Sequence, residues 1–100
     1  MTVLRIKEYT DLARDVKGNV ILAGKEPAIA EQTVVNTGAS TKSAAFNEQT
    51  RFVFITTDSI CSIKFGSDPT ATTSHDRLPV NAERFYGVNG GDKVAAVLNT

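Results

Sequence analysis

The sequence is poor in the residues that most often carry chemistry: it has one cysteine, one histidine and no tryptophan in 100 residues. The lone Cys61 cannot form an intramolecular disulfide, so the cross-links typical of small secreted domains are missing. No apolar run of about 18 residues occurs, and the opening MTVLRIKEYTD has no hydrophobic signal-peptide region. These absences predict a soluble protein that folds in a reducing cytoplasm.

Charge of one sign is also lacking, since 11 Lys and Arg residues balance 11 Asp and Glu residues. The basic residues are scattered along the chain rather than clustered. A neutral chain has no global field to draw it to nucleic acid or to an anionic bilayer. We therefore expect neither nucleic acid nor a membrane among its partners.

One loop holds the candidate catalytic residues. GSDPTATTSHDRLP (66–79) would supply Ser74 as nucleophile, His75 as base and Asp76 or Asp68 as the group that orients the base. Adjacent residues on an extended chain point to opposite sides, which opposes a Ser74–His75 pair, and no nucleophile elbow is present. A solvated loop is the alternative, and its composition favours it. We expect no enzyme activity.

A metal site has equally little support in the sequence. With one His and one Cys, the ligands would be carboxylates such as Asp68, Asp76 and Asp92, which lack the regular spacing of a calcium loop. Cys61 lies in a segment of alternating residues, which favours a buried small hydrophobe over a reactive thiol. We therefore expect no metal and no cofactor.

What the sequence does contain is strand signals. Four segments of the second half are rich in β-branched and aromatic residues and alternate as strands do: 51–57, 60–66, 82–88 and 93–99. Asp58 and Ser59 predict a hairpin turn between the first two, and NGGD (89–92) predicts another between the last two. The predicted core is Phe52, Phe54, Ile63, Phe65, Phe85, Val94 and Leu98, or the alternate residues on the same strands.

The first half gives weaker signals. Segments 2–9, 20–24 and 27–36 read as strands, 10–16 as a helical turn, and 43–47 as a short strand. The sum is about seven or eight short strands, which predicts an all-β fold, a small antiparallel β-sandwich or barrel, in a single domain over 1–100. The loop 66–78 is expected to lie against a surface, either joining two sheets or covering an open end. A ligand-binding aromatic face, with Tyr9 and Tyr86 as the residues to watch, stays open.

The second half resembles small structural proteins of tailed bacteriophages. The resemblance covers residues 50–98 and rests on TRFVFITTDSICSIKFGSDPTAT followed by LPVNAERFYGVNGGDKVAAVL, with the ending Gly91-Asp92-Lys93-Val94-Ala95. It is a pattern of turns and alternation rather than a catalytic signature.

This resemblance implies a non-enzymatic virion protein, a decoration or cement protein on the head rather than the tail, assembled in the host bacterial cytoplasm. Its expected partners are the major capsid protein or other virion proteins and further copies of itself, for example in a trimer. A carbohydrate- or receptor-binding module of a tail or adhesin is the alternative. The candidate contact segment is either an extended N-terminal arm over 1–9 that adds as a strand to a neighbour or an ordinary strand of the domain; its residues are Thr2, Val3, Leu4, Arg5, Ile6, Lys7, Glu8 and Tyr9.

Overall fold

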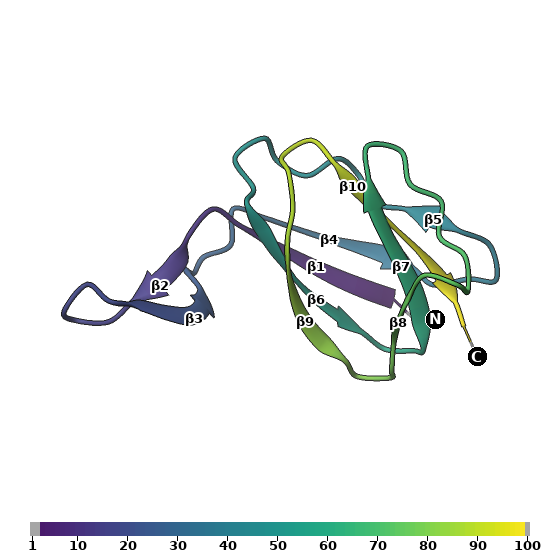
Figure 1. The fold of residues 1–100 in the computed structure, drawn as a ribbon, viewed down its shortest axis with the longest axis horizontal. Coiled ribbons are helices and arrows are strands. Elements are labelled where there is room, and N and C mark those ends of the chain that lie inside the picture. Colours follow the sequence, from purple (N-terminus) through teal and green to yellow (C-terminus); the bar gives the residue numbers. More distant parts are fainter. Residues whose placement is uncertain (1–2, 100) are drawn as a thin grey trace.

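The protein is an antiparallel β-sandwich with one projecting hairpin (Figure 1). The computed structural model describes residues 3–99, apart from the side chain of Leu22, and all regular structure in that range is β-strand. The strands are β1 (Val3–Tyr9), β2 (Leu12–Arg14), β3 (Val20–Gly24), β4 (Ala30–Val35), β5 (Thr41–Lys42), β6 (Phe52–Thr57), β7 (Cys61–Gly66), β8 (Asp76–Leu78), β9 (Glu83–Gly87) and β10 (Lys93–Leu98). The predicted all-β class is confirmed, and several of these strands have only two or three residues.

Two sheets of four strands pack face to face. Sheet 1 has the order β4-β1-β6-β9 and sheet 2 the order β5-β10-β7-β8, with every pairing antiparallel. The inward residues of both sheets form one core, which includes Leu4, Ile6, Val53, Ile55, Cys61, Ile63, Leu78, Val94 and Ala96. The alternation in β1 explains its place: Leu4 and Ile6 are buried while Arg5 between them is exposed.

The aromatic residues of sheet 1 lie on the side opposite to the core. In β6 the alternates Val53 and Ile55 are buried, and Phe52 and Phe54 point outward. Phe85 on β9 is likewise 47% exposed, so on β6 and β9 the core takes the alternate residues and not the phenylalanines. A strand with apolar residues on both of its faces can bury either face, and only packing against the opposing sheet decides which face is buried.

Other predicted core residues lie as expected. Ile63 and Val94 are fully buried and Phe65 packs against the core, while Leu98 is half-buried at the end of β10. Cys61 is a buried thiol, as the sequence indicated. Burial raises the pKa of the Cys61 thiol, since the charged thiolate is poorly solvated there.

Both predicted hairpins were wrong. The turn after β6 leads to β7 in the other sheet, and the turn after β9 leads to β10 in the other sheet. Strand β6 pairs instead with β1 and β9, and β7 pairs with β10 and β8. These short connections are arches that cross the sandwich, and turn-forming residues serve an arch as well as a hairpin.

The first half contains three predicted strands and lacks two predicted elements. Strands β1, β3 and β4 lie within the predicted segments 2–9, 20–24 and 27–36. The helical turn predicted at 10–16 is wrong, because β2 and a tight turn occupy that segment.

The short strand predicted at 43–47 is also wrong. The strand β5 lies just before this segment and pairs with β10. Beyond β5 only isolated backbone hydrogen bonds continue the pairing: the amide of Ser43 donates to the carbonyl of Val94, and the amide of Phe46 donates to the carbonyl of Asp92.

The loop between β7 and β8 covers the outer face of sheet 2. These strands are neighbours in one sheet, so the expectation that the loop crosses between sheets was wrong; residues 79–82 make that crossing. Ala71 packs on Ala95 and Val97 of β10, and all three are buried. The amide of Ala71 donates to Ser40 Oγ at 2.9 Å, and Asn99 Nδ2 donates to the Thr73 carbonyl at 3.3 Å. The loop does lie against a surface, but that surface is a sheet face rather than an open end.

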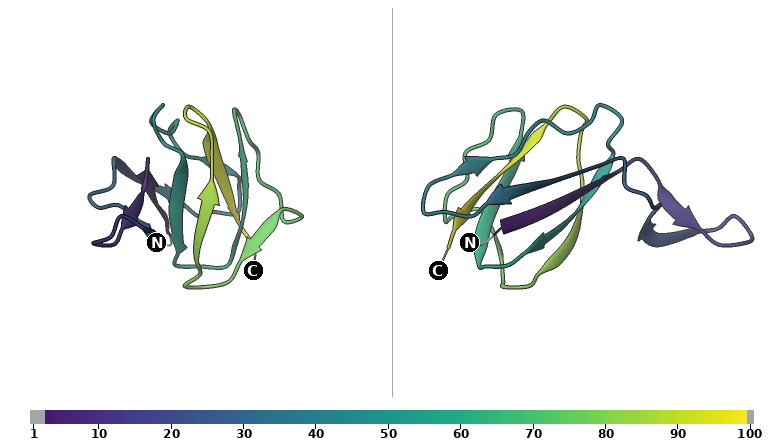
Figure 2. Two further views of the ribbon diagram at one scale, coloured as in Figure 1. Left: turned by 60° about the vertical axis from the view of Figure 1, so that its left-hand side comes forward. Right: turned by 180° about the vertical axis from the view of Figure 1, so that it is seen from behind.

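Strands β2 and β3 form a hairpin that extends away from the sandwich (Figure 2). It gives the molecule a long axis of 46 Å against 25 and 22 Å for the other two. Within residues 3–99 there is no helix that could cross a bilayer.

Candidate interaction surface

The outer face of sheet 1 carries a cluster of aromatic rings. Tyr9 of β1 and Phe52 of β6 stack with centroids 5.2 Å apart, and Phe85 of β9 lies 5.8 Å from Phe52 and 4.6 Å from Phe54. Cross-strand register brings these rings together, since Tyr9 pairs with Phe52 and Phe54 with Phe85. We call Phe52, Phe54 and Phe85, together with Tyr9 at their edge, the aromatic face.

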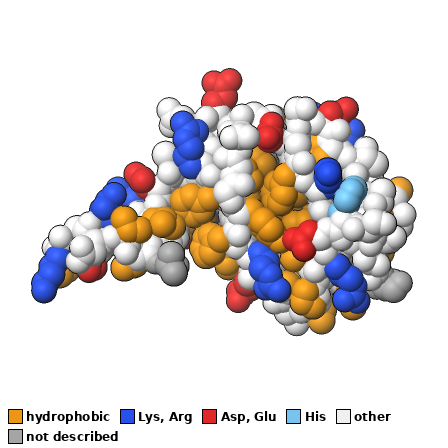
Figure 3. Space-filling model, viewed as in Figure 1, with side chains coloured by type: hydrophobic (Ala, Val, Ile, Leu, Met, Phe, Trp, Pro, Cys, Tyr) orange, Lys and Arg blue, Asp and Glu red, His pale blue; other side chains and the backbone are white. Residues whose placement is uncertain are grey.

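An apolar hollow opens where the aromatic face meets the projecting hairpin. It measures about 480 Å³ and is lined by Leu12, Phe52, Phe85, Tyr86 and Gly87. In the space-filling view, hydrophobic side chains run from the hairpin to the adjoining edge of the body (Figure 3). Apolar surface of this continuity is typical of a site that binds another molecule.

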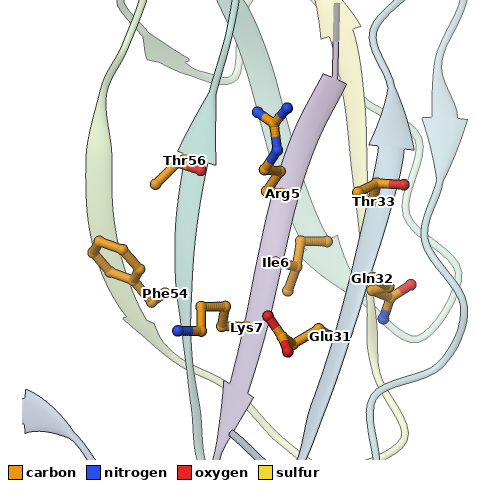
Figure 4. A pocket seen from close by; sticks show the side chains of 8 residues that line it. All are labelled: Arg5, Ile6, Lys7, Glu31, Gln32, Thr33, Phe54 and Thr56. Carbon is orange, nitrogen blue, oxygen red and sulfur yellow. The ribbon is translucent and has the colours of Figure 1, made fainter. Parts of the chain in front are cut away.

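The other half of the same sheet face is polar. A second hollow of about 400 Å³ lies over β6, β1 and β4, and Arg5, Lys7, Glu31, Thr33, Phe54 and Thr56 are among its lining residues (Figure 4). Arg5 pairs with Asp58 at 2.8 Å, and Lys7 pairs with Glu26 at 3.0 Å. The face thus combines aromatic rings with charges of both signs.

A built junction holds the projecting hairpin to this face. The Tyr9 hydroxyl and the Lys7 ammonium both donate to the Glu26 carboxylate, and the Lys7 Nζ lies 5.9 Å from the centre of the Tyr9 ring. Gly24 at the end of β3 rests on the Tyr9 ring, where a Cβ atom would lie 2.5 Å from the ring carbons. The hairpin is therefore seated on a buried tyrosine rather than loosely tethered.

The junction shifts the proton affinities of its members. The hydrogen bonds from Tyr9 and then from Lys7 hold the pKa of Glu26 below its ordinary value. The hydrogen bond to Glu26 holds the pKa of Lys7 above its ordinary value. Burial raises the pKa of Tyr9, and its bond to Glu26 adds to that effect. All three shifts keep the Glu26 carboxylate charged and its donors protonated near neutral pH.

The predicted N-terminal contact segment is an interior strand. β1 pairs with β4 on one edge and with β6 on the other, so it has no free edge with which to add to a neighbour, and the extended-arm hypothesis is wrong. Val3, Arg5, Lys7 and Tyr9 alternate onto the outer face, where a partner contact stays a prediction for them. Thr2 lies outside the described residues.

The remaining members of that segment, Leu4, Ile6 and Glu8, are buried. The Glu8 carboxylate accepts hydrogen bonds from the Asn47 amide at 2.8 Å, the Thr50 hydroxyl at 2.9 Å and the Gln32 amide at 3.2 Å. Gln32 in turn bonds both backbone groups of Ala44. Glu8 therefore anchors the connection between β5 and β6, which is a structural task inside the sandwich.

The candidate catalytic residues of the loop make separate local contacts. His75 Nδ1 accepts a hydrogen bond from the Thr72 amide at 3.0 Å, while the Ser74 amide donates to the Thr72 hydroxyl at 3.3 Å. These contacts form a tight turn at the end of the β7–β8 loop, which covers the outer face of sheet 2.

The aspartates considered for a metal site lie apart from one another. Asp68 pairs with Lys42 at 2.6 Å, and the salt bridge holds the pKa of Asp68 below its ordinary value. Asp76 accepts a hydrogen bond from the Tyr86 hydroxyl at 2.7 Å. Among residues 3–99 no group of three or more His, Cys, Asp or Glu side chains could hold a metal ion.

Tyr86, one of the two tyrosines proposed for a ligand-binding face, is partly buried and packs against the core. Tyr86 packs its ring 5.0 Å from Phe65, and burial with the bond to Asp76 raises its pKa. Tyr9 is buried beneath the hairpin. The exposed ring is Phe85, which sequence reasoning had assigned to the core. The signal in the sequence was that β6 has apolar residues on both of its faces, which indicates a second apolar surface outside the core.

Comparisons with protein-family models, with curated proteins and with solved structures give no match to this chain. The function therefore has to be argued from this surface and from the sequence.

Proposed function

We propose that this chain is a non-enzymatic structural protein of a bacteriophage virion, a decoration or cement protein that stabilises the shell by contacts with the major capsid protein and with copies of itself. The observation that carries the proposal is the uncovered aromatic face, continuous with a projecting apolar hairpin. Aromatic rings with a charged rim are the common composition of protein-binding surfaces. The resemblance of residues 50–98 to small phage proteins is the reason for proposing that this protein-binding role is in a virion.

Physically, such a protein works by burying surface at junctions between shell subunits. A standard specific interface buries on the order of 1,200–2,000 Å² in total. A projecting hairpin extends the reach of a small body, so one copy can contact two neighbours at once. Symmetry then repeats each contact around the particle.

The test is to quantify the protein by mass spectrometry in gradient-purified particles from the lysed source culture, relative to the major shell protein. Hundreds of copies per particle support decoration of the head. About a dozen copies or fewer would place it at the tail or portal and contradict the decoration role. Absence from particles would contradict the virion role altogether.

A second test measures the effect on the shell. Particles that lack the protein should release their genome at a lower temperature, and adding back purified protein should restore the release temperature. Protein in which Phe85 is replaced by Asp is the matched variant: it should fold, since Phe85 is about half exposed, but it should restore less. Equal restoration by both proteins would exclude the aromatic face as the shell contact.

A carbohydrate- or receptor-binding module of a tail or adhesin is the second candidate, favoured by the apolar hollow lined by Phe52, Phe85 and Tyr86. Aromatic rings in such hollows stack on sugar faces. Binding to a glycan array that is lost in Phe85→Ala but retained in Val80→Ala, an equally exposed apolar residue elsewhere, would favour this role. A blank array would exclude glycans as the ligand.

A further inference from the structure

The projecting hairpin exposes apolar side chains that no segment among residues 3–99 covers. Val16 at the tip is fully exposed, and Val20 and Ile21 on β3 are 50% and 43% exposed. A two-stranded hairpin has no core of its own and gains stability by packing against something else. The hairpin therefore has a surface suited to a partner.

The charge at the hairpin tip is positive toward solvent. The Asp15 carboxylate is occupied by the turn, where it accepts bonds from the amides of Lys17 and Asn19 at 2.8 and 2.9 Å. Arg14 donates to the Gly18 carbonyl and keeps its charge, and Lys17 has no ion pair among residues 3–99. Hydrogen bonds from the turn, that of the Asn19 amide first, lower the pKa of Asp15, so Asp15 stays charged as well. The two cations Arg14 and Lys17 against the one anion Asp15 leave the tip with one net positive charge.

The outer face of sheet 1 carries the complementary features. Register places Glu83 on the same side as Phe54 and Phe85, because it pairs with Thr56 two residues further along β6. Glu83 lies on the edge strand β9 and has no ion pair among residues 3–99, whereas the cations of this face, Arg5 and Lys7, are already paired. Aromatic rings beside a free carboxylate match apolar side chains beside a free ammonium.

The base of the hairpin lies on Tyr9, and its tip is held away from the rest of its own aromatic face. Gly24 and Glu26 fix its base on Tyr9, and Figures 1 and 2 show it extending outward from the sandwich. The tip therefore has to meet the face of another molecule. The net charge of zero means that copies do not repel one another at long range.

We propose that the hairpin of one copy packs on the aromatic face of the next, with Val16 and Ile21 against Phe54 and Phe85 and with Lys17 beside Glu83. Two different patches meet, so the contact is head-to-tail and generates a closed ring or an open filament. The inference rests on the proposed function and deepens it by naming a second copy as the occupant of this face.

The experiment measures the molar mass of the purified full chain by light scattering across a concentration series. The expected result is a mass of three or more chains that falls to one chain on dilution. Val16→Asp should weaken association by about tenfold or more, because it places a charge in the apolar contact. Val80→Asp is the matched control, since Val80 is 52% exposed in a different turn, and it should associate as the unmodified chain does.

Charge exchange tests the register of the contact. Lys17→Glu and Glu83→Lys should each weaken association by about threefold to tenfold, and the double variant should recover it. In a filament or an even-numbered ring, an equimolar mixture of the two single variants should also recover it, because the two variants can alternate and each hairpin then meets an opposite charge on its neighbour. Lys64→Glu, on an exposed position of sheet 2, is the matched control and should change nothing.

Three outcomes would overturn the proposal: a monomer at every concentration, association unaffected by Val16→Asp, or a double variant no better than the single variants. None of these outcomes would contradict the proposed virion role, because that role is tested by the number of copies in particles. Conversely, a chain that forms rings in solution yet is absent from particles would leave this contact standing and remove the proposed function.

Discussion

The two outer faces of the sandwich are built in opposite ways. On sheet 2 the outward residues of β10 are small, and the loop 67–75 lies over them, so that Ala95 and Val97 are buried. On sheet 1 the outward residues of β6 and β9 include Phe52, Phe54 and Phe85, and Phe85 is 47% exposed. One face is closed by the chain itself, and the other is left open.

Side-chain size accounts for the difference. Alanine and valine leave room for a loop of Thr, Ala and Ser to approach the sheet closely and bond to Ser40 and Asn99. Phenylalanine rings fill that space and present a large apolar area that no segment among residues 3–99 fully covers. This open aromatic face is therefore the surface on which we propose that a partner binds.

The largest expected effect comes from charging the covered face. Ala95→Asp should lower the free energy of unfolding by about 3 kcal/mol, because Ala95 is fully buried beneath Ala71. Its cross-strand neighbours Lys42 and Lys64 are exposed, so they offset only part of the cost of burying the charge. Urea denaturation measures the change. Thr33→Asp, at an exposed position on the outer face of sheet 1, is the matched control and should cost less than about 1 kcal/mol. Equal losses would mean that the two faces do not differ in burial.

The next effect concerns the seat of the projecting hairpin. Gly24→Ala should cost about 1–3 kcal/mol, because the new Cβ would overlap the buried Tyr9 ring. NMR shift changes should concentrate in β2, β3 and the Tyr9 ring while sheet 2 keeps its spectrum. Gly38→Ala, where a Cβ meets nothing within 4 Å, is the control and should be neutral or slightly stabilising. An unchanged spectrum for Gly24→Ala would show that the hairpin is not seated on Tyr9.

A smaller effect on stability is expected from removing a hydrogen bond that holds the β7–β8 loop against sheet 2. Ser40→Ala removes the acceptor of the Ala71 amide and should cost about 1 kcal/mol. The Ala71 amide should then exchange with solvent deuterium faster, while amides of β6 keep their rates. Ser67→Ala, at an exposed position of the same loop, serves as control. Faster exchange in sheet 1 as well would mean that the two faces are coupled rather than independent.

The smallest effect is a pH dependence of the hairpin seat. The pKa of Glu26 is lowered by its bonds to Tyr9 and Lys7, so its contribution to stability is complete above the ordinary glutamate pKa of about 4.3 and is lost as pH falls through the lowered value. A carbon-detected NMR titration should show Glu26 titrating below the ordinary glutamate value of about 4.3, and Lys7→Met should raise its midpoint. Titration of Glu26 at the ordinary value would contradict the junction.

The candidate surface was only partly predictable from the sequence. Apolar residues in both phases of RFVFITT indicate that both sides of this strand meet something apolar, but they do not say which side is the core. The choice falls to Val53 and Ile55, which fit between the sheets opposite Ile63 and Val94. The hairpin seat involves Tyr9, Gly24 and Glu26, which lie up to 17 positions apart, and no local pattern links them.

The N-terminal segment shows the same limit. Its alternation predicts a strand correctly, yet whether that strand is an edge or an interior one depends on β4 and β6 arriving on either side. An edge strand could add to a neighbour, and an interior strand cannot. The contact that we propose is therefore assigned to the face that β1 shares with the aromatic rings, and not to the backbone of β1.

By itself the sequence determined the β class, the positions of most strands and the burial of Cys61, because alternation and β-propensity act over a few residues. The tertiary structure alone decided which strands pair and which face is left open. The turn at Asp58 and Ser59 suits a hairpin or an arch equally well. The chain crosses to the other sheet after β6 because both edges of β6 are paired with β1 and β9, segments more than 25 residues away. Pairing is a competition among distant segments for the same backbone groups, and only the whole fold resolves it.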